Sequence, residues 1–470
     1  MIVRIGKSTA RGEISAPPSK SVAHRILICA ALAEGKTVVE NLSLSDDIRA
    51  TIACIESLGA SVTFGDGCCY LDGDDALPLS SSPSAPKTHT LTITGTGGKP
   101  HISGTFPCNE SGSTLRFILP LALLACGGDK AALFEGTQRL IERGIGVYEE
   151  ALSSSAVFAF SAQEKNEKQE NVGTISVDGT LEAGKYRLRG DISSQFVSGL
   201  LFALPLLRGD SEIEILPPTE SAGYIRLTMD TLRLFGVNIE KTSENSYFIG
   251  GGQTYRPPLS PAFPFTQNET EREIDSDGFK CPSAARYGEE AGRISVEGDW
   301  SNSAFLFALN ALGGNVYVSG LSEKSAQSDK KCLDFLQKIS RGFAEIDLSD
   351  YPDLAPILFS VAAAKHGGVF TGTRRLKLKE SDRAAAMQAE LKKFGIDAEI
   401  KENAVEIRLA REALTPNEPL SSHGDHRIAM ALAVLCTLTG GTIEGAEAVK
   451  KSCPSFFSDL SSLGVEITVI

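Results

Sequence analysis

Six segments of the chain share one pattern of polar and apolar positions. Each has a polar start rich in Ser, Asp or Asn, continues through about three apolar turns and reaches a glycine. Because the opening residues are good N-caps and glycine is a good C-cap, the pattern predicts six helices with defined ends. Their apolar residues surround the helix, so they are expected to be buried on most sides. The segments are 19–35, 110–128, 191–209, 299–314, 351–368 and 424–441.

A second kind of helix alternates with these. Segments 48–62, 226–240, 383–400 and 456–469 are amphipathic and end in an apolar-Gly-apolar step. In the third of them, Met387, Leu391 and Phe394 fall on one face, which predicts a half-exposed helix.

Short β-type runs fill the gaps between the helices. They lie at 37–42, 211–216, 315–320 and 368–373, and residues 1–14 have the alternation of a strand. The order predicts an α/β protein in which a βαβαββ-like unit recurs about six times, three units in each of two domains. Segments 76–100 and 253–290 break the pattern with Pro, Ser and polar residues, and are predicted to be surface insertions.

Composition narrows the function. The 470 residues are 42% hydrophobic, enough for two cores, and no apolar run reaches the ~18 residues that a membrane crossing needs. A net charge of −13 without a basic block argues against nucleic acid or an anionic membrane as partner. Ten cysteines without a C-x-x-C are typical of reduced core residues rather than a zinc site or disulfide frame. The sequence predicts a cytoplasmic protein.

The helix starts carry the candidate chemistry. A helix N-terminus has unpaired N–H groups and a partial positive charge, so several starts aimed at one place would bind anions. Ser and Asp there are also ordinary caps, but Lys20, Arg25 and Arg427 oppose the helix dipole and need an anion or carboxylate. The residues at these starts are Lys20, Ser21, Arg25, Ser111, Ser113, Ser193, Ser194, Gln195, Asp353, Asp425, His426 and Arg427.

Three other stretches add charged candidates. In 377–388, Lys379, Glu380 and Arg383 come together, with Lys379 and Arg383 one turn apart if the helix begins that early; a solvated helix start is the alternative. Arg143 lies in a glycine-flanked turn, and Lys451 lies shortly before a helix.

Four motifs together carry a resemblance. "PPSKSVAHR", "DISSQF", "KESDR" and "GDHRIAM" occur in this order, and with them the chain resembles the enolpyruvyl transferases, in particular those that act on shikimate 3-phosphate. The resemblance extends from Lys20 to the C-terminus apart from the two insertions. It implies a two-domain inside-out α/β barrel with three βαβαββ repeats and buried helices in each domain. The discontinuous domain would be 1–20 plus 246–470, and the central domain 21–245.

The resemblance also implies an activity. The enolpyruvyl group of phosphoenolpyruvate would pass to the 5-hydroxyl of shikimate 3-phosphate and release phosphate, on the route to chorismate and aromatic amino acids. No metal or cofactor is implied, and the protein would be a monomer. The residues expected to hold shikimate 3-phosphate are Ser21, Arg25, Ser193, Ser194, Ser221, Tyr224, Asp353 and Lys379. Those expected to hold phosphoenolpyruvate are Lys20, Gly112, Arg143, Gln195, Arg383, Arg427 and Lys451. The expected catalytic residues are Lys20, Asp353, Glu380 and His426.

Two alternatives and one departure remain. A sister enzyme transfers enolpyruvyl to a UDP-linked amino sugar, but it typically has Lys-Asn in place of Lys20 and Ser21, and a cysteine in the loop that here reads "RLIERGIG". A non-catalytic anion-binding relative is disfavoured because buried acids such as Asp353 and Glu380 penalise anion binding. Gly144 stands where the family usually has proline, which predicts a looser loop around Arg143.

Overall fold

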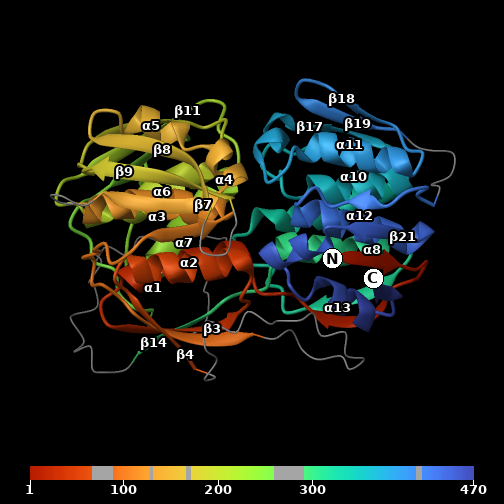
Figure 1. Ribbon diagram of the computed structural model, residues 1–470, viewed down its shortest axis with the longest axis horizontal. Coiled ribbons are helices and arrows are strands. Elements are labelled where there is room, and N and C mark those ends of the chain that lie inside the picture. Colours follow the sequence, from red (N-terminus) through yellow and green to blue (C-terminus); the bar gives the residue numbers. More distant parts are fainter. Residues whose placement is uncertain (66–87, 127–130, 166–170, 259–290, 409–414) are drawn as a thin grey trace, which may run out of the picture.

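The chain folds into two lobes, each with its own apolar core. The computed structural model describes residues 1–65, 88–126, 131–165, 171–258, 291–408 and 415–470. The core of the first lobe runs from Val22 to Tyr255 and includes Ile294 and Val296. The core of the second lobe contains Val3 to Ile14 and residues 300–465. Both chain termini lie in the second lobe (Figure 1).

Each lobe combines inner helices with outer strands. The helices of the first lobe are α1 (Lys20–Leu32), α2 (Asp46–Ser57), α3 (Gly112–Ala125), α4 (Gln138–Arg143), α5 (Gly146–Ala151), α6 (Ser194–Ala203) and α7 (Ala222–Leu234), followed by the 3-10 turn η1 (Leu204–Leu206) after α6. Those of the second are α8 (Trp300–Ala311), α9 (Cys332–Arg341), α10 (Ala355–Ala364), α11 (Arg383–Lys393), α12 (His426–Thr439) and α13 (Phe456–Ser462), with 3-10 turns η2 (Ser328–Lys331), η3 (Arg374–Leu378) and η4 (Ala446–Lys451).

The described strands form six sheets, three around each lobe. In the first lobe the orders are β14-β3-β5-β4, β6-β7-β9-β8 and β10-β11-β13-β12. These strands are β3 (Lys36–Leu42), β4 (Ser61–Phe64), β5 (His89–Thr94), β6 (Phe106–Asn109), β7 (Ala132–Thr137), β8 (Ala156–Lys165), β9 (Asn171–Gly179), β10 (Lys185–Arg189), β11 (Ser211–Leu216), β12 (Glu240–Lys241), β13 (Ser246–Ile249) and β14 (Gly292–Ser295).

The sheets of the second lobe have the orders β20-β21-β1-β22, β15-β2 and β16-β17-β19-β18. Their strands are β1 (Ile2–Ile5), β2 (Arg11–Ser15), β15 (Asn315–Ser319), β16 (Ala344–Asp347), β17 (Gly368–Thr371), β18 (Ala398–Ile400), β19 (Ala404–Ile407), β20 (Leu420–Ser421), β21 (Gly441–Glu444) and β22 (Ile467–Val469). Every sheet contains one parallel pair. In four sheets the paired strands directly flank one buried helix, as in a β-helix-β crossover: β6 and β7, β10 and β11, β16 and β17, and β20 and β21. The two-domain α/β architecture with repeated units is therefore confirmed.

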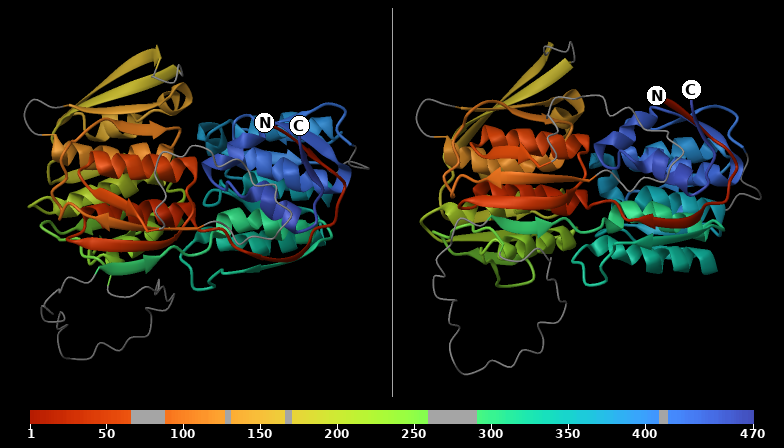
Figure 2. Two further views of the ribbon diagram at one scale, coloured as in Figure 1. Left: turned by 60° about the horizontal axis from the view of Figure 1, so that its bottom comes forward. Right: turned by 90° about the horizontal axis from the view of Figure 1, so that it is seen from below.

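Two strands are exchanged between the lobes. β2 precedes α1 of the first lobe but pairs with β15 in the second, whereas β14 precedes α8 of the second lobe but pairs with β3 in the first. The chain consequently crosses between the lobes twice, at residues 16–19 and 296–299, and the two crossings run side by side (Figure 2). They bind each other through Ser19 N, which donates to Glu297 O at 2.8 Å, and Asp299 N, which donates to Pro17 O at 2.8 Å.

The six apolar helices form as predicted and are nearly fully buried as α1, α3, α6, α8, α10 and α12. Side-chain caps are present at Ser111, Ser193, Asp299 and Asp425. The expected glycine caps are confirmed for α12, which ends at Gly440, and for α8, whose C-cap Leu312 is followed directly by Gly313 at φ +101°. They are wrong for α1, α6 and α10, which end before their glycines, and the glycines after α3 lie outside the described residues.

Three expectations about segments need correction. Residues 1–14 form two strands, β1 and β2, in different sheets. The 76–100 segment is not wholly a surface insertion, because β5 pairs with both β3 and β4; residues 76–87 lie outside the described part. Of 253–290, residues 259–290 also lie outside it, and Tyr255 is fully buried with its hydroxyl donating to Phe202 O at 2.7 Å.

The domain boundaries expected at 20/21 and 245/246 remain a prediction. The packing places β13 and β14, both after residue 245, in sheets of the first lobe. The first core thus extends past the second expected boundary.

Candidate active site

One cleft between the lobes collects the starts of several buried helices. The first lobe contributes the starts of α1, α3 and α6, and the second contributes the start of α12 and the segments preceding α10 and α11. The lining residues from the first lobe are Lys20, Ser21, Arg25, Asp47, Glu110, Gly112, Ser113, Phe117, Arg143, Ser193, Ser194, Gln195, Ser221 and Tyr224. Those from the second are Asp353, Arg375, Lys379, Glu380, Arg383, His426 and Arg427.

Every residue that the resemblance assigns to substrates or catalysis lines this cleft except Lys451, whereas the helix-start candidates Ser111 and Asp425 do not line it. Lys451, at the end of η4, reaches its edge, where Nζ lies 2.7 Å from Glu110 Oε2 of the first lobe and 2.5 Å from Gly424 O. The structure thus brings together side chains that are more than 400 residues apart in sequence. The convergence of helix starts, which periodicity alone could not establish, is confirmed.

Asp353 is the centre of a cluster of cations in the second lobe. Its carboxylate lies 2.7 Å from Arg383 Nη1, 3.3 Å from Lys379 Nζ and 3.4 Å from Arg427 Nη2. Burial alone raises the pKa of this carboxyl, but Arg427, Lys379 and Arg383 outweigh burial and hold it well below its usual range. Asp353 is therefore ionised at neutral pH. Burial also lowers the pKa of Lys379 to about 8, against the opposing effect of Asp353.

Arg383 connects this cluster to the start of α12. Its side chain is only 2% exposed, and Nε lies 2.8 Å from Asp425 Oδ2. Asp425 also caps α12 by accepting a hydrogen bond from Arg427 N at 2.9 Å. One buried carboxylate thus neutralises Arg383 and fixes the backbone at the start of α12. Lys379 precedes the first turn of α11, so the expected helical spacing of Lys379 and Arg383 is wrong.

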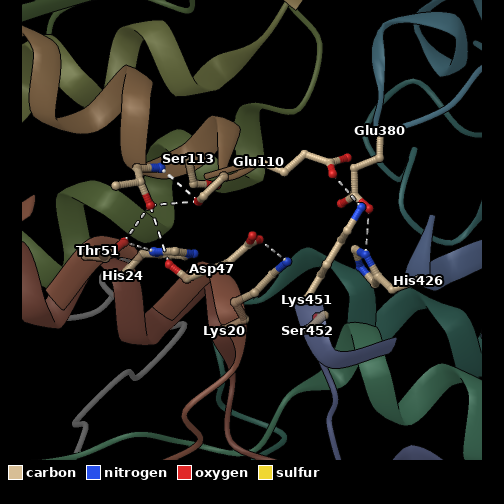
Figure 3. A network of polar contacts seen from close by, with 12 residues as sticks. Lys20, His24, Asp47, Thr51, Glu110, Ser113, Glu380, His426, Lys451 and Ser452 are labelled. Atoms are coloured by element: carbon tan, nitrogen blue, oxygen red, sulfur yellow. Dashed lines mark hydrogen bonds and ion pairs between the residues drawn. The ribbon is translucent and has the colours of Figure 1, made fainter. Parts of the chain in front are cut away.

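Glu380 and His426 form a hydrogen-bonded pair beside this cluster. His426 Nδ1 lies 2.9 Å from Glu380 Oε2, as the close view shows (Figure 3). Burial raises the pKa of Glu380, but His426, Lys20 and Arg383 outweigh it and hold that pKa well below its usual range. Burial lowers the pKa of His426 despite Glu380, so its neutral ring donates to an ionised carboxylate.

The first lobe binds its cations mainly through neutral groups. Arg25 donates to Thr228 Oγ1 at 2.8 Å, Ser21 O at 2.6 Å and Tyr224 O at 3.1 Å. Burial lowers the pKa of Arg25 to about 10, which still leaves it charged at neutral pH. Lys20 is the exception, because its Nζ lies 2.7 Å from Asp47 Oδ2.

Gln195 is fixed by two neighbours. Its Nε2 donates to Ser113 Oγ at 2.8 Å, and its Oε1 accepts from Arg116 Nη1 at 2.6 Å. The amide therefore has a defined orientation at the start of α6.

Arg143 is held close to the backbone of α3. A Cβ added to Gly112 would lie 2.8 Å from Arg143 Nη2, so only glycine permits this approach. Arg143 Nε is buried and has no hydrogen-bond partner among the described residues. The next residue, Gly144, has φ +66°, a conformation closed to proline, whose φ is near −65°. The departure at Gly144 therefore gives Arg143 a different turn rather than only a looser one.

Four lining residues were missed in the sequence: Asp47, Glu110, Phe117 and Arg375. Asp47 lies in the first turn of the amphipathic helix α2, where an acid is ordinary. Arg375 Nη2 donates to Ser221 Oγ at 2.7 Å across the cleft. No spacing signal marks these residues, because each reaches the cleft only through the packing of the lobes.

A metal site is not supported by the bonding. Glu380, Asp425 and His426 bring ligand-type atoms within 4.8 Å of one another. However, Asp425 is paired with Arg383, and His426 Nδ1 is bound to Glu380. The set therefore has ion-pair and hydrogen-bond partners of its own.

In the part of the chain that the structure describes, no helix is both long and apolar enough to cross a bilayer.

Fold and cleft together define a two-lobed α/β protein in which both lobes line one cleft with cations and with acids paired to them. The family described as EPSP synthase (3-phosphoshikimate 1-carboxyvinyltransferase) matches residues 5–77, 84–260 and 282–460. The chain belongs to this EPSP synthase family.

Individual relatives agree with the family. The chain is similar to a 3-phosphoshikimate 1-carboxyvinyltransferase of Clostridium kluyveri, with 35% identity over 99% of this chain and 98% of the relative. It is 36% identical to one of Clostridium acetobutylicum, with coverage of 99% and 98%. A solved structure of EPSP synthase from Acinetobacter baumannii has the same fold, with a TM-score of 0.66 at 22% identity over 100% of both chains.

Proposed function

We propose that the cleft transfers the enolpyruvyl group of phosphoenolpyruvate to the 5-hydroxyl of shikimate 3-phosphate and releases phosphate, a step toward chorismate and the aromatic amino acids. Membership of the EPSP synthase family supports this activity. The observation that carries the proposal is the meeting, in one cleft, of Lys20 and Arg143 from the first lobe with Asp353 and Glu380 from the second. Two polyanions need many fixed cations, and transfer needs acids beside them.

Shikimate 3-phosphate is assigned mainly to the first lobe. The start of α6 offers hydroxyl and backbone N–H donors, and Arg25 adds a fixed charge, a combination suited to phosphate. Asp353 and Lys379 complete the site from the second lobe. The residues assigned to this substrate are Ser21, Arg25, Ser193, Ser194, Ser221, Tyr224, Asp353 and Lys379.

Phosphoenolpyruvate is assigned to the arginines that face both lobes. Arg143 has donors to offer, and Arg383 and Arg427 are held rigidly by carboxylates. Arginine matches carboxylate and phosphate with a planar fork of donors. The residues assigned to it are Lys20, Gly112, Arg143, Gln195, Arg383, Arg427 and Lys451.

The addition needs two proton transfers. Glu380 gives a proton to the methylene carbon of phosphoenolpyruvate while Asp353 accepts the proton of the attacking hydroxyl. In the elimination, the Glu380 carboxylate left by the addition takes a proton back from the new methyl group as the bond to phosphate breaks, and the proton held by Asp353 passes to the departing phosphate. Lys20 and the arginines stabilise the charge on the departing phosphate, and His426 orients Glu380.

Binding of phosphoenolpyruvate is expected to change the ionisation of Glu380. In the empty cleft, Lys20 and Arg383 help to keep the pKa of Glu380 low, which makes it a poor acid. The anionic groups of phosphoenolpyruvate would pair with those cations and raise that pKa. Substrate binding thus prepares Glu380 to donate its proton.

A coupled assay tests the proposal. The purified chain is offered phosphoenolpyruvate with either shikimate 3-phosphate or the UDP-linked amino sugar, and phosphate release is followed. Turnover with shikimate 3-phosphate is expected. Turnover only with the UDP-sugar would instead select the sister activity, and tight binding without any turnover would identify a non-catalytic relative.

We also propose that the protein acts as a monomer in the cytoplasm. Both lobes of one chain complete the cleft, so the site does not require a second copy. Light scattering at the protein concentration of the assay would check the mass, and fractionation of the source cells would check the location.

A further inference from the structure

We propose that Arg139 is a positioning residue that couples closure of the lobes to the placement of Glu380. Arg139 belongs to α4 of the first lobe and does not line the cleft. Its Nε donates to Glu380 O at 3.0 Å, and its Nη2 donates to Lys379 O at 3.2 Å. The inference rests on the proposed function, because Lys379 and Glu380 have their roles there.

Arg139 can hold the backbone of Lys379 and Glu380 in place because its helix, α4, is firmly attached to the first lobe. Thr137 caps α4 by accepting a hydrogen bond from Leu140 N at 3.2 Å, and Leu140 is 1% exposed. Residues 138–143 thus form a short helix tied to β7 and packed against β9. Movement of the first lobe is transmitted directly to the guanidinium.

The gripped segment needs such support. Residues 379–382 lie between η3 and α11. On the side of the second lobe, Ser381 Oγ donates to Asp425 Oδ2 at 3.1 Å. Arg139 is the matching support from the first lobe, and it binds backbone carbonyls, so its contact survives substitution of either side chain. Opening the lobes breaks both hydrogen bonds and leaves the segment held from one side.

The same helix carries Arg143 one turn further along. Residues at i and i+4 share a helix face, so α4 presents one arginine to the backbone of the acid-bearing segment and another to the cleft. Arg143 and the Glu380 carboxylate attract each other, although burial is the main cause of the lowered pKa of Arg143. Closure of the lobes therefore brings Arg143, which binds substrate, and Arg139, which positions the acid, into place together.

The test combines Arg139→Ala, Arg139→Lys and an exposed control, Arg187→Ala, which removes the same charge from β10. Two lost hydrogen bonds to a reacting segment are expected to lower kcat of Arg139→Ala roughly 20-fold. Arg139→Lys should fall between Arg139→Ala and the native protein, since lysine can replace one bond but not a fork of two. The control should match the native protein.

Three readouts separate positioning from loss of folding. Affinity of the free enzyme for shikimate 3-phosphate should stay within about twofold, guanidinium chloride at millimolar concentration should restore part of kcat to Arg139→Ala, and hydrogen exchange of residues 379–382 in the presence of both substrates should increase. Native-like kcat in Arg139→Ala would overturn the inference, as would a loss that guanidinium does not restore and that extends to shikimate 3-phosphate binding. An inactive native protein would instead remove the proposed function.

Discussion

The two walls of the cleft bind their functional groups in different ways. The first-lobe wall fixes Arg25 and Gln195 by hydrogen bonds to hydroxyls, carbonyls and Arg116. The second-lobe wall fixes Arg383 and Arg427 by ion pairs to Asp425 and Asp353. The two walls thus hold these cations through different partners, mainly neutral groups in the first and carboxylates in the second.

Two buried histidines show the same contrast. His24 Nδ1 lies 2.7 Å from Thr51 Oγ1, and Thr51 in turn lies 2.7 Å from Thr114 Oγ1, a neutral network behind the first wall (Figure 3). His426 instead binds the ionised Glu380. A ligand that binds the arginines of the second wall must therefore replace internal ion pairs.

The largest effect is expected from Glu380→Gln. The amide keeps the size of the side chain but cannot donate a carboxylic proton, so turnover should fall ~100-fold or more. Binding of shikimate 3-phosphate, assigned mainly to the first wall, should be nearly unchanged in calorimetry. Glu345→Gln, an exposed acid of the second lobe, is the control. Near-normal turnover would remove Glu380 from the mechanism.

The stability of the folded protein in acid should depend on His24 of the neutral network. Burial lowers the pKa of His24 from 6.5 to about 3, so between these values the unfolded chain binds a proton that the folded chain does not. This contribution is complete above pH 6.5 and is lost as pH falls, by about 2 kcal/mol at pH 5. His24→Asn should remove that slope from urea unfolding curves at pH 5 and 7. The exposed His366→Asn should retain the slope, and an unchanged slope in His24→Asn would contradict the argument.

Asp353→Asn should make the second wall resemble the first. Arg383, Lys379 and Arg427 would lose a shared carboxylate, so the empty cleft should bind inorganic phosphate ~10-fold more tightly even as turnover falls. Isothermal titration with phosphate measures the change. Asp334→Asn, which removes an exposed acid from α9, should leave phosphate affinity unaltered. Weaker phosphate binding in Asp353→Asn would show that the acid does not compete with anions.

The smallest effect concerns the pH dependence of Lys379. Because its pKa is lowered to about 8, the amine loses its charge as pH rises through that value. Affinity for shikimate 3-phosphate should therefore fall roughly fourfold between pH 7 and 8.5. Titration with shikimate 3-phosphate, followed by calorimetry at each pH, measures the change. Lys379→Arg keeps its charge over this range and should give a flatter profile in the same titration. Parallel profiles would show that Lys379 does not contact the substrate.

The sequence was most informative where one helix carries its own signal. The six apolar helices were predicted because a buried helix needs apolar residues all round, and Lys20, Arg25 and Arg427 were conspicuous because a cation in a first turn is unfavourable without a partner. The motifs then assigned Arg143 and Glu380 through resemblance. The glycine ends of α1, α6 and α10 and the helical spacing of Lys379 and Arg383 were predicted less well. Lys379 follows the turn η3, and Asp382 caps α11 only after it.

The sequence alone thus determined the repeated α/β units, the buried helices and the residue types of an anion site, because these depend on neighbours within a few turns. Tertiary structure decided the exchange of β2 and β14, the pairing of Lys451 with Glu110, and the grip of Arg139 on the segment of Glu380. These contacts join residues more than 200 positions apart in the sequence. Only the packing of the whole chain sets such distances.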